Sequence, residues 1–282
     1  LIEFESGSAD IAYDIAPSDI PAVEENSELT LMNTPNLGSE YLGLSLHNDT
    51  PLREVKVRQA IAHAVDVEAI IDTVYMGVGD QMSGPINELV FGFNDDLEPI
   101  EYDVNKAKDL LAEAGYPDGG FSLSLYVGDN SQERIRVSQV VSEALAEVGI
   151  TVEVQQMEWG AFLDSAAVGE PDMFLLGWTT VTTDADYGLY PLFHSNSFGE
   201  AGNRTFYENE RVDELLDAGR YSTDQDQRLE DYREVQEIIH EEVPWVFLQT
   251  RENVTGLSNR VHGFEHHPTG SYDLSVVTLD AE

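Results

Sequence analysis

Several chemical groups and sequence patterns are missing from this chain of 282 residues. It contains no cysteine, which excludes disulfides, thiolate metal sites and cysteine nucleophiles. No apolar run reaches the length of a transmembrane helix. There is also no phosphate-binding glycine loop, no Gly-x-Ser-x-Gly elbow and no helix with the paired histidines of a zinc protease. We therefore predict no catalytic residue, no metal ligand and no cofactor.

Positive charge is scarce. The chain has 14 basic residues against 54 acidic residues, and its formal net charge is −40. This charge opposes nucleic-acid binding, because phosphates would be repelled. The acidic residues are spread over the whole chain rather than gathered in blocks, as they would be in an acidic tail that binds a partner. We interpret them as a surface solvated in concentrated salt, where repulsion is screened, and we predict a halophilic source.

An enzyme is the alternative from a different functional class. A halophilic hydrolase could use two paired carboxylates in an α/β domain. With 54 acidic residues, however, such pairs arise by chance, so their presence in the sequence favours no glycosidase-type site.

Hydrophobic periodicity predicts strands that alternate with helices. The predicted strands are a short one within 11–19 and longer ones at 41–46, 121–127, 150–156, 172–178, 245–250 and 272–279. The 172–178 segment is more continuously apolar, as expected at the centre of a sheet. The predicted helices are a Pro-started one within 11–19, a pair within 51–76 with Asp66 as the second N-cap, one capped by Asp103 and ended by Gly115, and helices at 131–148, 210–219 and 225–241. This order predicts an α/β fold with a mixed or largely parallel sheet.

Several short segments together resemble a known family. They are Glu5 to Ala12, the helix pair at 51–76, Tyr102 to Pro117, Val148-Gly149-Ile150, Glu158-Trp159-Gly160, Gly177-Trp178 with Asp184 and Asp186, and Glu242-Val243-Pro244. In this order and at these separations they resemble the family 5 solute-binding proteins, the extracytoplasmic ligand carriers of dipeptide, oligopeptide and nickel ABC importers. The resemblance implies a periplasmic-binding-protein-like fold of type II, in which two lobes close on a ligand.

The resemblance also implies a division of the chain. Residues 1–38 would be the end of an incomplete first lobe, residues 39–258 the second ligand-binding lobe, and residues 259–282 a return segment to the first lobe. The chain opens at Leu1-Ile2-Glu3 without a methionine, so we expect a signal, a membrane anchor and most of the first lobe to lie outside it. The implied protein is an extracellular, surface-anchored monomer. It would capture a peptide or similar small polar solute and deliver it to permease subunits, although sensing instead of transport remains open.

The candidate ligand-binding residues follow a buried strand and its neighbour. The resemblance places the cleft after Gly177, and a polar loop at the carboxyl edge of a strand is a usual ligand site in α/β folds. The predicted set is Trp159, Trp178, Thr179, Thr180, Val181 and Asp184. Core packing for the two tryptophans and a turn cap for Asp184 remain the structural alternatives.

The charged anchors of the dipeptide-binding members are missing at their usual positions. The resemblance implies an aspartate for the ligand ammonium where Val181 stands, and an arginine for its carboxylate where Gly128 stands. Arg134 and Arg136 lie on the following helix, and we expect them to be surface residues. A longer peptide held by its backbone, an oligosaccharide or another polar solute fits this pattern at least as well as a dipeptide.

Overall fold

The computed structural model describes residues 1–280, and its centre is one six-stranded sheet. The strands are β1 (Ile11–Ala12), β2 (Leu29–Leu44), β3 (Ser122–Gly128), β4 (Thr151–Met157), β5 (Met173–Thr179) and β6 (Trp245–Ser258). Their order across the sheet is β1-β6-β2-β5-β3-β4. β3 pairs in parallel with β4 and β5, whereas β2 pairs antiparallel with β5 and β6. The sheet is therefore mixed, and the apolar strand β5 lies inside it as expected.

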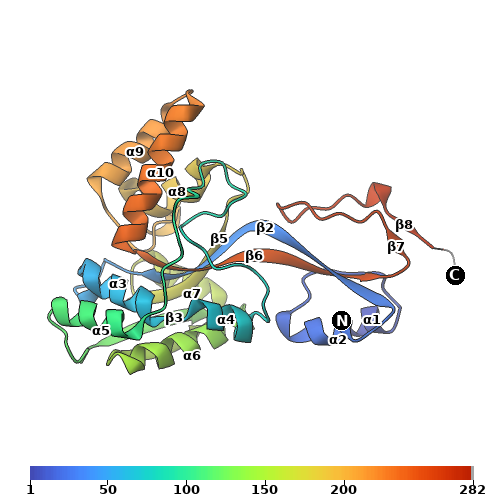
Figure 1. Cartoon of the computed structure of the whole chain (residues 1–282), viewed down its shortest axis with the longest axis horizontal. Helices are drawn as coiled ribbons and strands as arrows, with labels where there is room; N and C mark the ends of the chain where they lie inside the picture. Colours follow the sequence, from blue (N-terminus) through green and yellow to red (C-terminus); the bar gives the residue numbers. More distant parts are fainter. Residues whose placement is uncertain (281–282) are drawn as a thin grey trace.

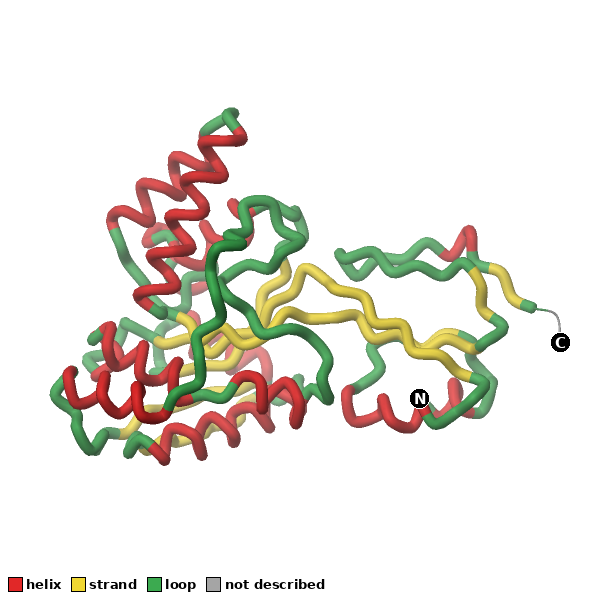
Figure 2. Tube along the Cα trace, viewed as in Figure 1, coloured by secondary structure: helices red, strands yellow, loops and turns green. Residues whose placement is uncertain are grey.

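Helices cover both faces of this sheet (Figures 1 and 2). One face is covered by α3 (Val55–Ala64), α4 (Val67–Val74), α5 (Val104–Glu113) and α6 (Gln132–Glu147). The other face is covered by α7 (Trp159–Ala167), α8 (Ala185–Phe193), α9 (Glu210–Tyr221) and α10 (Gln225–Glu242). Alternate strand residues supply the two cores. Leu42 faces the first and Tyr41 the second, where it stacks on Trp245 with ring centroids 3.4 Å apart.

A two-stranded ribbon projects from this body (Figure 1). β2 and β6 pair antiparallel from Gly43↔Trp245 to Leu29↔Ser258, with a register shift between Pro35 and Ser39. The far end of the ribbon carries α1 (Ile2–Glu5), α2 (Ile20–Glu24) and the small sheet of β7 (Val261–His262) and β8 (Thr278–Leu279). A separate small core there includes Phe4, Ile20 and Val254. Among the described residues, no helix combines the length and apolarity needed to cross a bilayer.

Local signals explain the helix ends. Asp66 accepts a hydrogen bond from the Ala69 amide, and Asp103 accepts from the amides of Asn105 and Lys106, so both residues are N-caps as predicted. Gly115 follows α5 with a φ of 93°, a conformation that favours glycine.

Several predicted boundaries are wrong. β2 begins well before the predicted strand at 41–46, and β6 ends well after the predicted strand at 245–250. The prediction missed these residues because they form the ribbon outside the body and lack the simple alternation of a half-buried strand. The predicted strand at 272–279 is instead a short 3₁₀ helix (Leu274–Val276) followed by β8. Helices α7 and α8 were not predicted, and Trp159 is the first residue of α7.

Candidate functional site

The loop after β5 is fixed by backbone hydrogen bonds on both sides. The Thr180 amide donates to the Leu37 carbonyl at 3.0 Å. The Phe91 amide donates to the Thr183 carbonyl, and the Ala185 amide donates to the Phe91 carbonyl, each at 2.9 Å. Thr183 has a φ of 56°. The candidate loop is therefore held in place by β2 and by the long 77–99 connection.

Asp184 serves as a structural cap. Its carboxylate accepts from the Asp186 amide at 2.9 Å and begins α8. The same oxygen, Oδ1, contacts Arg228 Nη2 at 2.7 Å, and this hydrogen bond raises the pKa of Arg228. The sequence left a turn cap as the alternative role of Asp184, and the structure shows a cap at the start of a helix instead.

The two candidate tryptophans are partly buried, Trp178 near the end of β5 and Trp159 just after β4, with β3 between these two strands. Trp178 donates its indole N–H to the Tyr187 carbonyl at 3.1 Å, which fixes the ring against α8. Trp159 packs on Phe162 with ring centroids 5.6 Å apart. A Cβ on Gly128 would lie 2.7 Å from the Trp159 ring, so this ring fills the space at the position where an arginine was looked for.

The remaining candidates differ in exposure. Thr180 is buried and packs against Gly188 of α8, so its hydroxyl is not on the surface. Val181 is 51% exposed and presents an apolar side chain. Thr179 lines a cavity of about 310 Å³ together with Asn36, Arg251, Asn253 and residues 268–270. Among the candidates, Thr179 is the one that lines this cavity.

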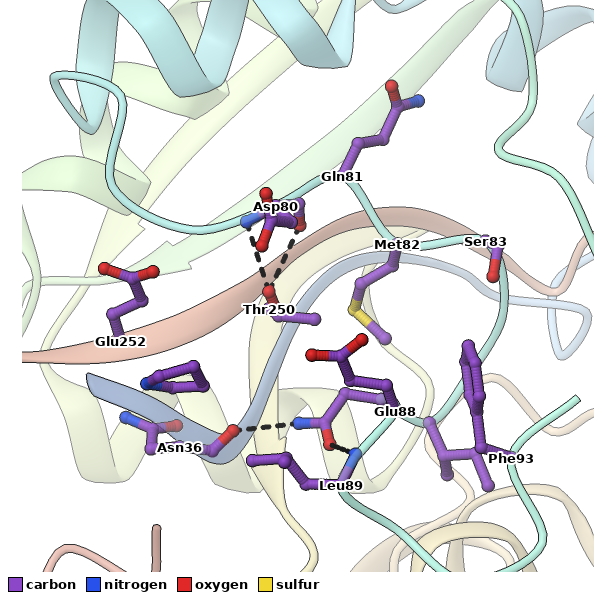
Figure 3. Close-up of a pocket in the computed structure, with 13 residues that line it drawn as sticks. Asn36, Asp80, Gln81, Met82, Ser83, Glu88, Leu89, Phe93, Thr250 and Glu252 are labelled. Atoms are coloured by element: carbon purple, nitrogen blue, oxygen red, sulfur yellow. Dashed lines mark hydrogen bonds between the residues drawn. The ribbon is translucent and has the colours of Figure 1, made fainter. Parts of the chain in front are cut away.

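A second pocket adjoins this cavity and was missed in the sequence (Figure 3). Asp80, Glu88 and Glu252 stand around it, and apolar side chains that include Met82, Leu89 and Phe93 line it. Its volume is about 170 Å³. Burial, with a smaller effect of Asp80, raises the pKa of Glu252. The length of the 77–99 connection was the available signal, because long loops in compact domains are often functional.

A buried ion cluster was also missed. Arg134 is only 8% exposed, so the prediction that it is a surface residue is wrong. Its Nε and Nη2 contact Glu40 Oε2 and Oε1 at 2.9 and 3.0 Å, and Arg251 contacts Oε1 from the other side. Burial alone would raise the pKa of Glu40, but Arg251 and Arg134 hold that pKa below its ordinary value. Glu40 is therefore ionised, and the cluster carries one net positive charge.

Within residues 1–280, no group of three or more histidine, aspartate or glutamate side chains is arranged to hold a metal ion. What the site offers is a polar cavity beside aromatic rings, a local surplus of positive charge and nearby carboxylates. This arrangement suits binding of a polar solute.

Comparisons with known proteins agree on one family. The sequence profile of the bacterial extracellular solute-binding proteins, family 5 (middle region), matches residues 1–200. The chain is 32% identical to the glutathione-binding protein GsiB of Pectobacterium atrosepticum over 98% of this chain and 54% of that protein. It is 30% identical to the dipeptide-binding protein of Escherichia coli K12 over 94% of this chain and 50% of that protein.

A solved structure shows the same fold. The periplasmic binding protein DppA of Helicobacter pylori, in complex with the peptide STSA, matches with a TM-score of 0.86 and 28% identity. The match covers 99% of this chain and 54% of that one. This chain spans about half the length of the curated relatives it matches. The profile match, the sequence identities and the shared fold together show that the chain belongs to the family 5 extracellular solute-binding proteins.

Proposed function

We propose that this chain is part of the substrate-binding component of an ABC importer, which captures a peptide or similar small polar solute. The observation that carries the proposal is the cavity at the root of the ribbon. Thr179 lines it from the body, and residues 268–270 line it from the far segment. A solute bound there touches both parts of the molecule. The names of the relatives, which are dipeptide-binding and glutathione-binding proteins, support a peptide-like ligand.

The β2–β6 ribbon supplies the hinge in this proposal. Residues 1–38 and 259–282 belong to the first lobe and residues 39–258 form the second, so closing the lobes bends two adjacent strands. A ligand that contacts both lobes stabilises the closed state through its extra contacts. The chain itself catalyses no reaction. It acts outside the cell, held at the surface by an anchor, and as a monomer it presents its ligand to the permease subunits.

A ligand screen by thermal shift tests the proposal. The full-length protein is heated in molar KCl with dipeptides to octapeptides, with oligosaccharides and with nickel chelates. A ligand that binds only the native state raises the melting temperature. We expect a rise with peptides. A rise only with sugars or chelates would overturn the peptide assignment and leave solute binding in place, and no rise with any class would contradict solute capture.

A further inference from the structure

Arg251 has donor groups that the protein does not use. Its Nε and Nη2 face Glu40 Oε1, which occupies the side edge of the guanidinium. Nη1 has no hydrogen-bond partner among residues 1–280. The end edge, formed by Nη1 and Nη2, is therefore open, and this edge matches the two oxygens of a carboxylate.

The open edge belongs to a side chain that borders empty space. The Arg251 side chain is 33% exposed and lines the cavity that contains Thr179. It also lines a neighbouring cavity of about 300 Å³ with Tyr75, Ser131 and Gln249. The guanidinium thus stands where two cavities meet at the root of the ribbon.

A second unused donor lines the first of these cavities. Asn253 is 7% exposed, and its Oδ1 accepts from Asn36 Nδ2 at 3.1 Å. Its own Nδ2 has no hydrogen-bond partner among the described residues. A buried amide donor without a partner costs free energy, and an oxygen-bearing ligand in the cavity would satisfy it.

Charge in the cluster favours an anion. Glu40 balances one of its two arginines, so one positive charge remains in a chain whose formal net charge is −40. Asp14 and Glu252 also line the cavity, but neither forms an ion pair with Arg251. They repel polyanions, so only a small anionic group that reaches the guanidinium edge is favoured.

We propose that Arg251, held by Glu40 and assisted by Asn253, anchors a carboxylate of the bound solute. This inference rests on the proposed function and names the ligand class more closely, as solutes with a free carboxylate. It supplies a cationic anchor from β6 in place of the arginine absent at Gly128. Specificity then comes from a charge-assisted pair that an uncharged analogue cannot form.

Matched peptides test the anchor in the full-length protein. Alanine tetrapeptide and octapeptide, each as the free acid and as the C-terminal amide, are titrated by calorimetry in molar KCl. We expect the acid to bind about tenfold tighter than the amide, as a charge-assisted bond predicts. In Arg251→Gln this preference should vanish, so that the acid binds no tighter than the amide. Arg251→Lys, which keeps the charge and loses the planar edge, should recover part of it.

Two further variants separate anchoring from folding. Asn253→Asp replaces a donor by an acceptor, leaves the Glu40–Arg251 contact in place and should also weaken the acid preference. Arg233→Gln removes an arginine that pairs with Asp95 on the surface and should change nothing. An acid preference that survives in Arg251→Gln overturns the anchor alone. Failure of every peptide to bind, as acid and as amide, overturns the peptide assignment of the proposed function together with the anchor.

Discussion

At the scale of single residues, the structure explains why a glycine occupies position 177. A Cβ at this position would lie 2.2 Å from Arg251 Nη2 and 3.0 Å from Arg134 Nη2. The glycine before Trp178 therefore leaves the room in which two guanidinium groups reach Glu40. In the sequence, Gly177-Trp178 was singled out only by its resemblance to the family. The structure shows the steric reason why position 177 is a glycine.

Gly177→Ala should disturb this cluster. The added methyl group forces at least one guanidinium away from Glu40, and overpacking of this kind costs about 1–3 kcal/mol of unfolding free energy. Urea unfolding in molar KCl measures the loss. Gly160→Ala is the matched control, because its Cβ would meet only the flexible end of exposed Glu158. Equal stability of the two variants would contradict the steric argument.

Val181→Asp should add recognition of a ligand ammonium group. Val181 is 51% exposed, so the new carboxylate stays hydrated and the fold should tolerate it. We expect tighter binding of peptides with a free N-terminus and no gain for N-acetylated ones, measured by calorimetry on the full-length protein. Thr182→Asp puts the same charge on the exposed neighbouring residue and serves as the control. A similar gain in both variants would show a general charge effect instead.

At the scale of elements, one carboxylate joins three of them. Glu40 lies on β2, Arg134 on α6 and Arg251 on β6, so the cluster ties the helix layer to both strands of the ribbon. Removing Glu40 would leave Arg134 buried without its carboxylate. Breaking a buried pair in this way is far more destabilising than losing a surface pair.

Glu40→Gln should therefore lower the unfolding free energy by about 3–5 kcal/mol near neutral pH. Because the folded-state pKa of Glu40 lies below its ordinary value of 4.5, the contribution is complete above that pH and declines as the pH falls below it. The difference between wild type and variant should narrow at acidic pH in urea titrations. Glu234→Gln, which removes an exposed pair with Arg211, should show a small difference throughout. A Glu40→Gln difference independent of pH would argue against an ionised Glu40.

The features that were predicted correctly from the sequence depend on short-range signals. The caps Asp66 and Asp103 and the apolar run of β5 act within a few residues, and these elements were predicted correctly. The Glu40–Arg134 pair spans 94 residues, and nothing local marks it. Periodicity places Arg134 on the same face of α6 as Val137, Val141 and Leu145, but its charge suggested the surface. The cavity at Thr179 depends on residues 268–270, whose approach to Leu37 is a tertiary contact.

At the scale of the whole molecule, repulsion among acidic residues dominates the electrostatics. With a formal charge of −40, the folded state repels itself in dilute buffer, and the Debye length falls to about 3 Å at 1 M salt. A halophilic source stays a prediction from this charge.

The melting temperature should accordingly rise steadily from about 0.1 M to molar KCl. Differential scanning calorimetry measures it, and sucrose at matched osmotic strength controls for solvent exclusion. A melting temperature that does not change with KCl would mean that the acidic surface does not limit stability.

The ribbon has a further consequence for how the protein is built. The chain enters the body along β2 and leaves it along β6, and these two strands are hydrogen-bonded neighbours from Gly43↔Trp245 outward. Topologically, the body is an insertion at the tip of a hairpin, and insertions whose two ends lie close together are readily tolerated. In a chimeric protein, a body from another family member would therefore have to match the ribbon at two adjacent backbone positions. It would also have to keep the contact between Glu40 of the ribbon and Arg134 of the body. The ribbon thus confines the covalent connections of the body to one two-stranded junction.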